Sequence, residues 1–197
     1  METLISDASQ VLGIDPHELQ DWIAECSVPQ VLLKPMLLTV KRLSLNPLLG
    51  HLAWELNLEG DWELFLPIDA WITLINREKK FQGITFSQSS QMENGIPIWM
   101  ECSIYRCDLT YPITVREYFI ELKTEHPMWA QMPRRMLRHK TVQQCARLAF
   151  GISVPKIKIS KPNQALSKMG MHPQNVSVPN VKQTLKEKLI SESTHAR

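Results

Sequence analysis

The sequence predicts an α+β fold, in which an antiparallel sheet follows N-terminal helices and a long basic helix follows the last strand. Three observations support this prediction. Residues 3–43 carry helical periodicity, residues 52–118 carry runs in which apolar and polar residues alternate, and residues 133–150 again have the spacing of a helix. Successive strands with helices at both ends and short connections are typical of an antiparallel sheet.

Helical periodicity at the N-terminus indicates two helices within residues 3–25 and a further helix over residues 30–43. The first two are separated at Gly13, and we expect Asp15 to cap the second, because aspartate is a preferred N-cap residue. Pro35 must lie near the start of the helix over residues 30–43 or kink it.

Alternation of apolar and polar residues predicts the strands. Residues 52–58 and 62–66 alternate on either side of Glu59-Gly60-Asp61, which predicts a hairpin. A helix capped by Asp69 is predicted over residues 69–76. Further strands are predicted at residues 84–87, 98–106 and 113–118, with joints at 93–95 and 108–112.

The composition changes after residue 152. Prolines recur between residues 151 and 186 among scattered lysines and polar residues. We therefore expect a core over residues 1–152 and a basic, mobile tail over residues 153–197. Within this tail, residues 181–190 have the spacing of a short helix.

Charge is divided unevenly along the chain, although the formal net charge is only +2. Residues 1–125 hold 9 Lys and Arg against 18 Asp and Glu, whereas residues 126–186 hold 11 Lys and Arg and no carboxylate. Such a basic block predicts an anionic partner, of which nucleic acid is the commonest. The alternative is a basic patch that docks on the acidic half of the same or a neighbouring subunit.

Residues 133–150 predict one amphipathic helix, with Pro133 at its first position. One stripe should face a core and contains Leu137, Thr141, Cys145, Leu148 and Ala149. The opposite face has two cations, two amides and no carboxylate, namely Lys140, Gln143, Gln144 and Arg147. Arg134, Arg135 and Arg138 lie in the first two turns, where backbone N–H groups favour a phosphate. A solvated basic face is the alternative interpretation.

Signatures of catalysis are not apparent in the sequence. There is no glycine-rich nucleotide-binding loop and no serine elbow motif, and we expect no catalytic residue, metal site or cofactor. We assign structural roles to three carboxylates that a nuclease could use: Asp69 as a cap, Glu101 as an exposed strand residue and Asp108 as a turn residue. The cysteines lack zinc-ligand spacing, so we expect reduced thiols in a cytoplasmic protein. No apolar run is long enough for a transmembrane helix.

Several motifs in this chain resemble those of the RecT/Redβ family of single-strand DNA annealing proteins. The resemblance spans residues 15 to about 152 and rests on these segments: Leu45-Asn46-Pro47, Ile68 to Asn76, Phe81 to Phe86, Cys102 to Arg106, Met136 to Lys140 and Gln144 to Gly151. The last of these is long and specific.

The resemblance implies an activity and a site. Members of this family anneal complementary single strands without ATP in phage-type homologous recombination and recombineering. They hold single-stranded DNA and the annealed intermediate in a basic groove of a homo-oligomeric ring or helical filament. The family's functional cations match Arg134, Lys140 and Arg147, with Arg135 beside them. Location in the cytoplasm of a bacterial host, from a phage or mobile element, is also implied.

Two departures from the family pattern affect these expectations. Close relatives carry lysines where this chain has Gly50 and Leu58, which leaves His51 as the potential cation near the first hairpin. Longer members carry a C-terminal domain that recruits a partner exonuclease and the host single-strand-binding protein. Only 46 of the 197 residues follow Gly151, so the sequence does not support that recruitment, the exonuclease and the single-strand-binding protein stay possible partners, and the basic tail is an alternative contact to DNA.

The sequence is also compatible with two other functions and with a set of residues that could stack on bases. Trp71, Trp99, Tyr105 and Trp129 are candidates for stacking on bases, although alternation places most of them in the core. A basic regulatory or interaction module that binds duplex DNA would share the charge pattern. A nuclease of the same pathway is the remaining possibility, against which the scattered carboxylates argue.

Overall fold

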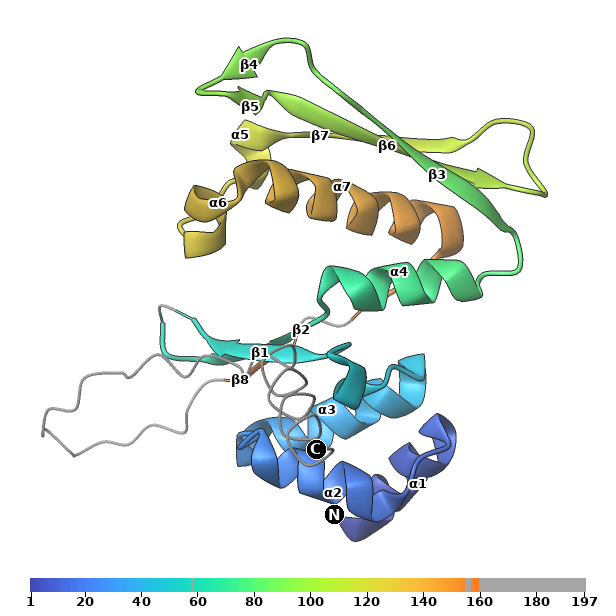
Figure 1. The fold of residues 1–197 in the computed structure, drawn as a ribbon, viewed down its shortest axis with the longest axis vertical. Helices are drawn as coiled ribbons and strands as arrows, with labels where there is room; N and C mark the ends of the chain where they lie inside the picture. The colour runs from blue at the N-terminus through green and yellow to red at the C-terminus, as the bar shows by residue number, and fades with distance from the viewer. Residues whose placement is uncertain (58, 155–156, 160–197) are drawn as a thin grey trace, which may run out of the picture.

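The computed structural model describes residues 1–57, 59–154 and 157–159, and it confirms the α+β fold. Helices α1 (Glu2–Leu12), α2 (Pro16–Glu25) and α3 (Gln30–Leu43) form one end of the molecule (Figure 1). Gly13 ends α1 at a φ of 68°, and the Asp15 carboxylate accepts a hydrogen bond from the His17 N–H at 2.8 Å. Both predicted boundaries are therefore confirmed, and α3 continues through Pro35.

A three-stranded antiparallel sheet packs on these helices. Its strands are β1 (Ala53–Leu56), β2 (Trp62–Phe65) and β8 (Ile157–Ile159), in the order β1-β2-β8. The predicted hairpin is β1 and β2, and a short 3-10 helix, η1 (Pro47–Leu49), precedes it. Trp54 turns toward the helices, where its ring meets Trp22 edge to face at 5.9 Å.

Strand β8 lies in the segment for which the sequence suggests a tail. Lys158 forms ion pairs with Glu59 and Asp61, next to the β1–β2 turn. Because β8 follows the basic helix, β7 (Ile113–Tyr118) is not the last strand of the chain, contrary to prediction. Residues 160–197, including the predicted helix at 181–190, lie outside the described residues.

A second antiparallel sheet forms the other end of the molecule, in the order β3-β6-β7. Its other strands are β3 (Phe81–Gln88) and β6 (Trp99–Arg106), as the alternation predicts. A hairpin of β4 (Met92–Glu93) and β5 (Ile96–Pro97) continues from the ends of β3 and β6, and Asn94 and Gly95 make the turn with φ of 49° and 76°. Positive φ at both residues is the usual geometry of a two-residue hairpin turn.

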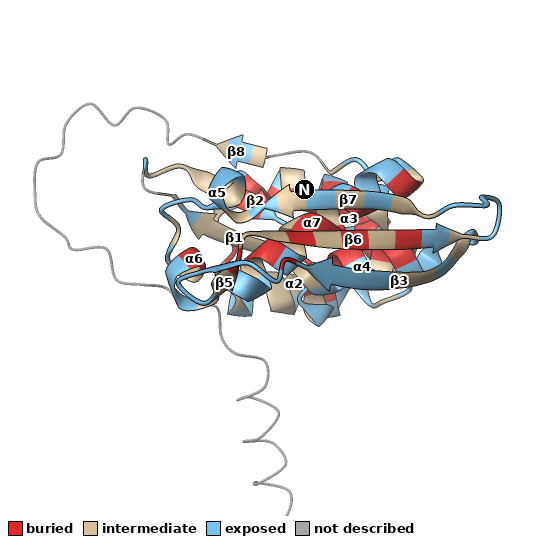
Figure 2. Ribbon diagram, turned by 90° about the horizontal axis from the view of Figure 1, so that it is seen from above, coloured by how far each residue is buried: buried red, intermediate tan, exposed pale blue. Residues whose placement is uncertain are grey.

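One face of this second sheet is covered by helix and the other is not (Figures 1 and 2). Short helices α5 (Phe119–Leu122) and α6 (Pro127–Gln131) lead into α7 (Pro133–Phe150), which crosses β6 and β7. On β6, Met100, Cys102 and Ile104 are buried beneath it, whereas Tyr105 on the opposite face is exposed. This pattern is typical of an antiparallel sheet with one solvated face.

Helix α4 (Ile68–Arg77) connects the two ends of the molecule, because it packs against α7 and leads into β3. Pro67 takes its N-cap position and Asp69 lies inside the first turn without a side-chain capping bond, so the predicted Asp69 cap is wrong. An acidic residue in that turn still favours the positive end of the helix dipole. Within the described ranges, every helix is too short or too polar to span a lipid bilayer.

Candidate nucleic-acid interface

Helix α7 has two packed ridges and two polar ridges, each made of residues four apart. The first packed ridge holds Leu137, Thr141, Cys145 and Ala149, all at most 1% exposed, and the second holds Val142 and Ala146. The predicted core position of Leu148 is wrong, because its side chain is 69% exposed. Leu148 lies on the ridge of Lys140 and Gln144, which faces away from the sheet.

Polar contacts fix the first packed ridge at two points. The Thr141 hydroxyl donates to the Leu137 carbonyl at 2.8 Å, so its buried oxygen has a partner inside the helix. The Cys145 thiol donates to the carbonyls of Cys102 on β6 and Ile113 on β7, at 3.3 and 3.2 Å. All four cysteines are free thiols. The rotation of α7 about its axis is therefore set by the sheet, and this determines which side chains face outward.

The two polar ridges bring five of the seven predicted DNA-binding residues to one side of α7: Arg135, Lys140, Gln143, Gln144 and Arg147. Gln144 and Arg147 are exposed, and Lys140 and Gln143 are half-buried. Arg147 donates to the Gln144 side-chain carbonyl at 3.2 Å, and its guanidinium carbon lies 5.4 Å from the centre of the buried Trp71 ring on α4. An arginine stacked on an aromatic ring is held in place while its outer N–H groups remain able to donate.

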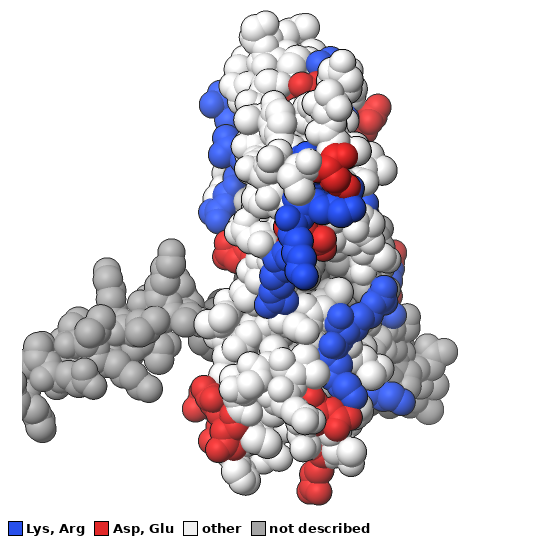
Figure 3. Space-filling view, turned by 90° about the vertical axis from the view of Figure 1, so that its right-hand side faces the viewer, with Lys and Arg blue, Asp and Glu red and all other residues white. Residues whose placement is uncertain are grey.

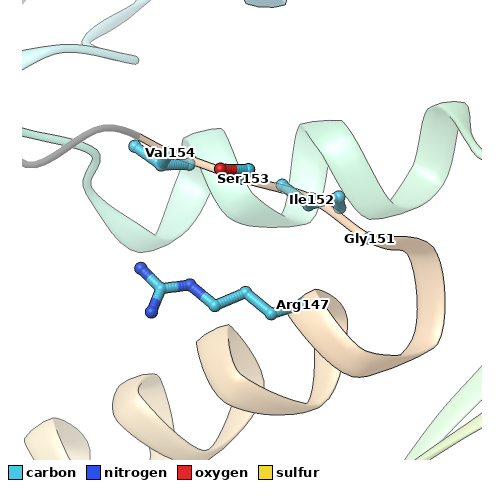
Figure 4. Close-up of a pocket in the computed structure, with 5 residues that line it drawn as sticks. All are labelled: Arg147, Gly151, Ile152, Ser153 and Val154. Carbon is cyan, nitrogen blue, oxygen red and sulfur yellow. The ribbon is translucent and has the colours of Figure 1, made fainter.

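A shallow hollow of about 400 Å³ adjoins Arg147 (Figure 4). Its other wall is the segment 151–154, which leaves α7 and runs toward β8. Gly151 permits this exit, because it ends α7 at a φ of 67° while its N–H donates to the Arg147 carbonyl. The guanidinium of Arg147 points into the space beside this segment (Figure 4).

The arginines at the start of α7 are placed differently. Arg134 donates to the Gly95 carbonyl in the β4–β5 turn through both Nε, at 2.9 Å, and Nη2. Arg138 lies over the Phe86 ring of β3, 5.7 Å from its centre. Both lie on the second packed ridge, one and two turns before Val142. This ridge faces the sheet, so their side chains extend to the edge strand β3 and the β4–β5 turn. The structure therefore separates Arg134 and Arg138 from Lys140 and Arg147.

Arg135 and His139 precede Gln143 on the ridge of Arg147, although His139 was not among the sequence candidates. Arg135 is exposed and its guanidinium lies 3.9 Å from the Met132 sulfur. Burial, and then the positive charge of Arg135, lower the pKa of His139. Near neutral pH this histidine is a neutral member of the ridge, able to hydrogen-bond but not to add charge.

Candidate residues away from α7 have structural roles. His51 is buried, accepts the Asn46 N–H at 3.3 Å and lies 3.4 Å from the Thr73 hydroxyl. Burial, followed by the nearby charge of Arg77, lowers the pKa of His51, so it does not supply the hairpin cation that the sequence allows. Gly50 lies at the end of η1, and residue 58 is outside the described residues.

The four aromatic candidates lie in different environments. Trp71 and Trp129 are each 3% exposed and belong to the core. Trp99 is half-buried beneath Arg116, whose guanidinium carbon is 4.0 Å from its ring centre, and Tyr105 is exposed on the uncovered face of the sheet. These rings are not gathered beside the polar ridges of α7.

The candidate carboxylates are also dispersed. Glu101 pairs with Arg116 at 2.9 Å. Asp108 pairs with Arg106 and Lys80, whose hydrogen bonds hold the pKa of this carboxyl well below its usual range. Asp69 is on α4. Within the part of the chain that the structure describes, no group of three or more His, Cys, Asp or Glu side chains has the arrangement of a metal site.

Two cations that the sequence interpretation did not select lie near Arg147. Arg42 in the last turn of α3 and Arg77 in the last turn of α4 line a second hollow of about 550 Å³, which shares Gly151, Ile152 and Ser153 with the first. Both belong to the half of the chain with a net negative charge. Neither a motif nor a charge run marks them, so only the fold brings them to this place.

Comparison with known proteins finds a family whose model matches most of this chain. The model of the RecT family matches residues 18–175. Recombination protein bet of Escherichia phage lambda is 37% identical over 97 residues, which cover 44% of this chain and 34% of that protein. The match thus spans about a third of the length of this curated relative.

Proposed function

Because this chain belongs to the RecT family, we propose that it anneals complementary single strands of DNA without ATP, in homologous recombination of the phage type. The observation that carries this proposal is the polar side of α7, where Lys140, Gln143, Gln144 and Arg147 lie together without a carboxylate. The similarity to a phage protein named for recombination supports the pathway. Such a protein would act in the cytoplasm of the bacterial host.

Annealing requires that two phosphate backbones are held close together while the base edges remain available. Contacts to phosphate and sugar position DNA without reading its sequence. In our proposal Lys140 and Arg147 bind phosphates, and Gln143 and Gln144 donate to phosphate or sugar oxygens. If Lys140 and Arg147 each neutralise one phosphate, they should give log K a slope against log salt of about −1.4 per subunit, because the neutral amides release no counterions.

Assembly extends this site. We propose that copies of the chain form a ring or helical filament, in which one polar side of α7 per subunit lines a continuous groove for single-stranded DNA and the annealed intermediate. Arg135 begins the same ridge and contributes charge there. Arg134 and Arg138 contribute through long-range attraction while they hold the β4–β5 turn and Phe86.

The test is strand annealing with two complementary oligonucleotides added one after the other, without ATP. We expect faster pairing than in the absence of protein and a complex that retains the new duplex at elevated salt. The double variant Lys140→Ala/Arg147→Ala should lose both, for all sequences alike. A preference for preformed duplex without acceleration would instead support the second candidate, a duplex-binding regulatory or interaction module, which the charge of residues 126–186 alone also allows.

The same reaction mixtures test whether the protein is instead a nuclease of the same pathway. End-labelled DNA incubated with the protein and magnesium should stay intact, because the candidate carboxylates Glu101 and Asp108 are each engaged in a separate ion pair. Cleavage that survives further purification and disappears in a Glu101→Gln or Asp108→Asn variant would contradict the assignment as a non-enzymatic protein.

A further inference from the structure

Three helices end at the same corner of the molecule, and each has an arginine in its last turn. These are Arg42 on α3, Arg77 on α4 and Arg147 on α7. Segment 151–153 runs between them and lines both hollows. The two hollows therefore adjoin, with Arg147 lining the first and Arg42 and Arg77 lining the second.

The charge of this corner is strongly positive. Seven cations lie at the ends of the elements that meet there or in the link from α4 to β3: Lys41, Arg42, Arg77, Lys79, Lys80, Arg106 and Arg147. Three carboxylates accompany them, and two are already paired: Asp7 with Lys41 at 2.7 Å, and Asp108 with Lys80 and Arg106. Figure 3 looks onto this end, where Lys and Arg side chains gather across the middle of the surface.

An alternative role for these arginines is to offset the helix dipoles. A helix C-terminus carries roughly −0.5 of an elementary charge, so three of them amount to about −1.5. Together with Glu78, which lines the second hollow, this offsets part of the positive charge. The seven cations exceed the three carboxylates, Glu78 included, by four, so a positive excess of about 2.5 charges remains after the dipoles are counted.

The hydrogen bonds of the arginines leave donors available. Arg77 Nη1 donates to the Leu43 carbonyl at 3.0 Å, which fixes the guanidinium over the end of α3. The Arg42 side chain is exposed and has no hydrogen bond or ion pair to any other described residue. Guanidinium groups bind phosphate oxygens through paired N–H donors, so an anchored arginine beside an unengaged one suits a phosphodiester.

We propose that this second hollow is a phosphate-binding extension of the DNA path, in which Arg42 and Arg77 contact the backbone of the single strand that passes Arg147. This rests on the proposed annealing function, because it continues the same path beyond the end of α7. The ligand is a run of phosphates on one strand, and segment 151–153 forms the surface that the strand crosses. The contacts are independent of sequence, as backbone contacts are.

The test uses the full chain and fluorescence anisotropy with labelled single-stranded oligonucleotides over a range of salt. The variant Arg42→Ala/Arg77→Ala should bind on the order of 20-fold more weakly at about 0.1 M salt, with a salt slope less steep by about 1.4. A matched control, Lys34→Ala/Lys123→Ala, removes two exposed cations elsewhere and should change affinity less than about threefold. Equal effects in the two variants would overturn the proposal.

Two further variants separate this proposal from its alternatives. The variant Arg42→Lys/Arg77→Lys keeps both charges, so it should bind single-stranded DNA nearly as tightly as the unmodified protein. It tests the role of charge even if the alanine variant does not fold. Loss of self-association without DNA, measured by sedimentation of the alanine variant, would mean that the corner binds an acidic surface of a second copy, and would contradict a DNA site. If Lys140→Ala/Arg147→Ala weakens binding but Arg42→Ala/Arg77→Ala does not, the extension fails while the annealing function stands.

Discussion

On the sheet-facing side of α7, Arg134 and Arg138 reach the β4–β5 turn and the Phe86 ring of β3, whereas on the opposite side Arg147 lies over Trp71 beside a hollow. All three arginines belong to one basic block of sequence and one helix. Their roles differ because each ridge of the helix has a different neighbour. The ridge of Arg134 and Arg138 faces the β4–β5 hairpin and the edge strand β3, whereas the ridge of Arg147 faces α4 and solvent. A count of positive charges on a helix therefore overestimates the number of groups that are available to a ligand.

The largest expected difference is in stability, between substitutions of two leucines on opposite sides of α7. Leu137→Ala should lower the free energy of unfolding by about 2–5 kcal/mol, because it leaves a cavity between α7 and the sheet. Leu148→Ala should change it by less than about 0.5 kcal/mol, because that side chain is exposed. Urea unfolding of both variants measures the difference. Similar losses would mean that the ridge of Lys140 and Leu148 is packed in the folded protein.

The next largest difference is in DNA affinity, between substitutions of cations on the two sides of α7. Lys140→Ala/Arg147→Ala should weaken binding to single-stranded DNA on the order of 20-fold at about 0.1 M salt, if each residue contacts one phosphate. Arg134→Ala/Arg138→Ala should weaken it several-fold less, because these side chains extend to the β4–β5 turn and the edge of the sheet rather than to the polar side of α7. The comparison is made by anisotropy on the same oligonucleotide. An equal loss of affinity in Arg134→Ala/Arg138→Ala and Lys140→Ala/Arg147→Ala would contradict the contrast between the two sides of α7.

Arg134 should contribute to stability as well. Arg134→Ala leaves the Gly95 carbonyl without its guanidinium donor, which should cost about 1 kcal/mol in the free energy of unfolding. The control is Arg135→Ala, which removes the same charge from an exposed position one residue later and should cost less than about 0.5 kcal/mol. Equal costs in denaturant unfolding would remove the structural role that we assign to Arg134.

The smallest expected effect concerns pH. The pKa values of His51 and His139 are lowered in the folded protein, in both cases first by burial. The unfolded chain then binds more protons, so stability should be fully present above about pH 6.5 and decline as the pH falls through the folded pKa values. Thermal unfolding over a pH series measures this. A His139→Gln variant should show a weaker decline, and an unchanged profile would contradict a contribution from His139.

Local pattern in the sequence was sufficient for much of the fold. The strands β1, β2, β3, β6 and β7 follow from alternation, and Gly13 and Asp15 mark the break between α1 and α2. The errors arise where tertiary contacts decide. Leu148 satisfies a helical stripe, but the sheet covers the neighbouring ridge instead. Asp69 is a good capping residue, yet Pro67 takes the N-cap position two residues earlier.

The candidate site was predictable only in part, for a similar reason. Helical spacing places Lys140, Gln143, Gln144 and Arg147 together, because these four residues lie on one element. The same spacing cannot show that Arg134 reaches Gly95, since that contact joins residues 39 positions apart. Arg42 and Arg77 are further from any local signal, because three separate helices must end at one corner before they become neighbours.

Strand β8 has a consequence for the smallest fragment that could be prepared. It forms one edge of the β1-β2-β8 sheet, where Ile157 and Ile159 join the core and Lys158 offsets Glu59 and Asp61. A fragment that stops at residue 152 would leave β2 with unpaired backbone groups beside uncovered apolar side chains. Edges of this kind template aggregation. A soluble minimal domain should therefore extend through residue 159, and a carrier protein fused there would emerge beside the N-terminal helices rather than at the end of α7.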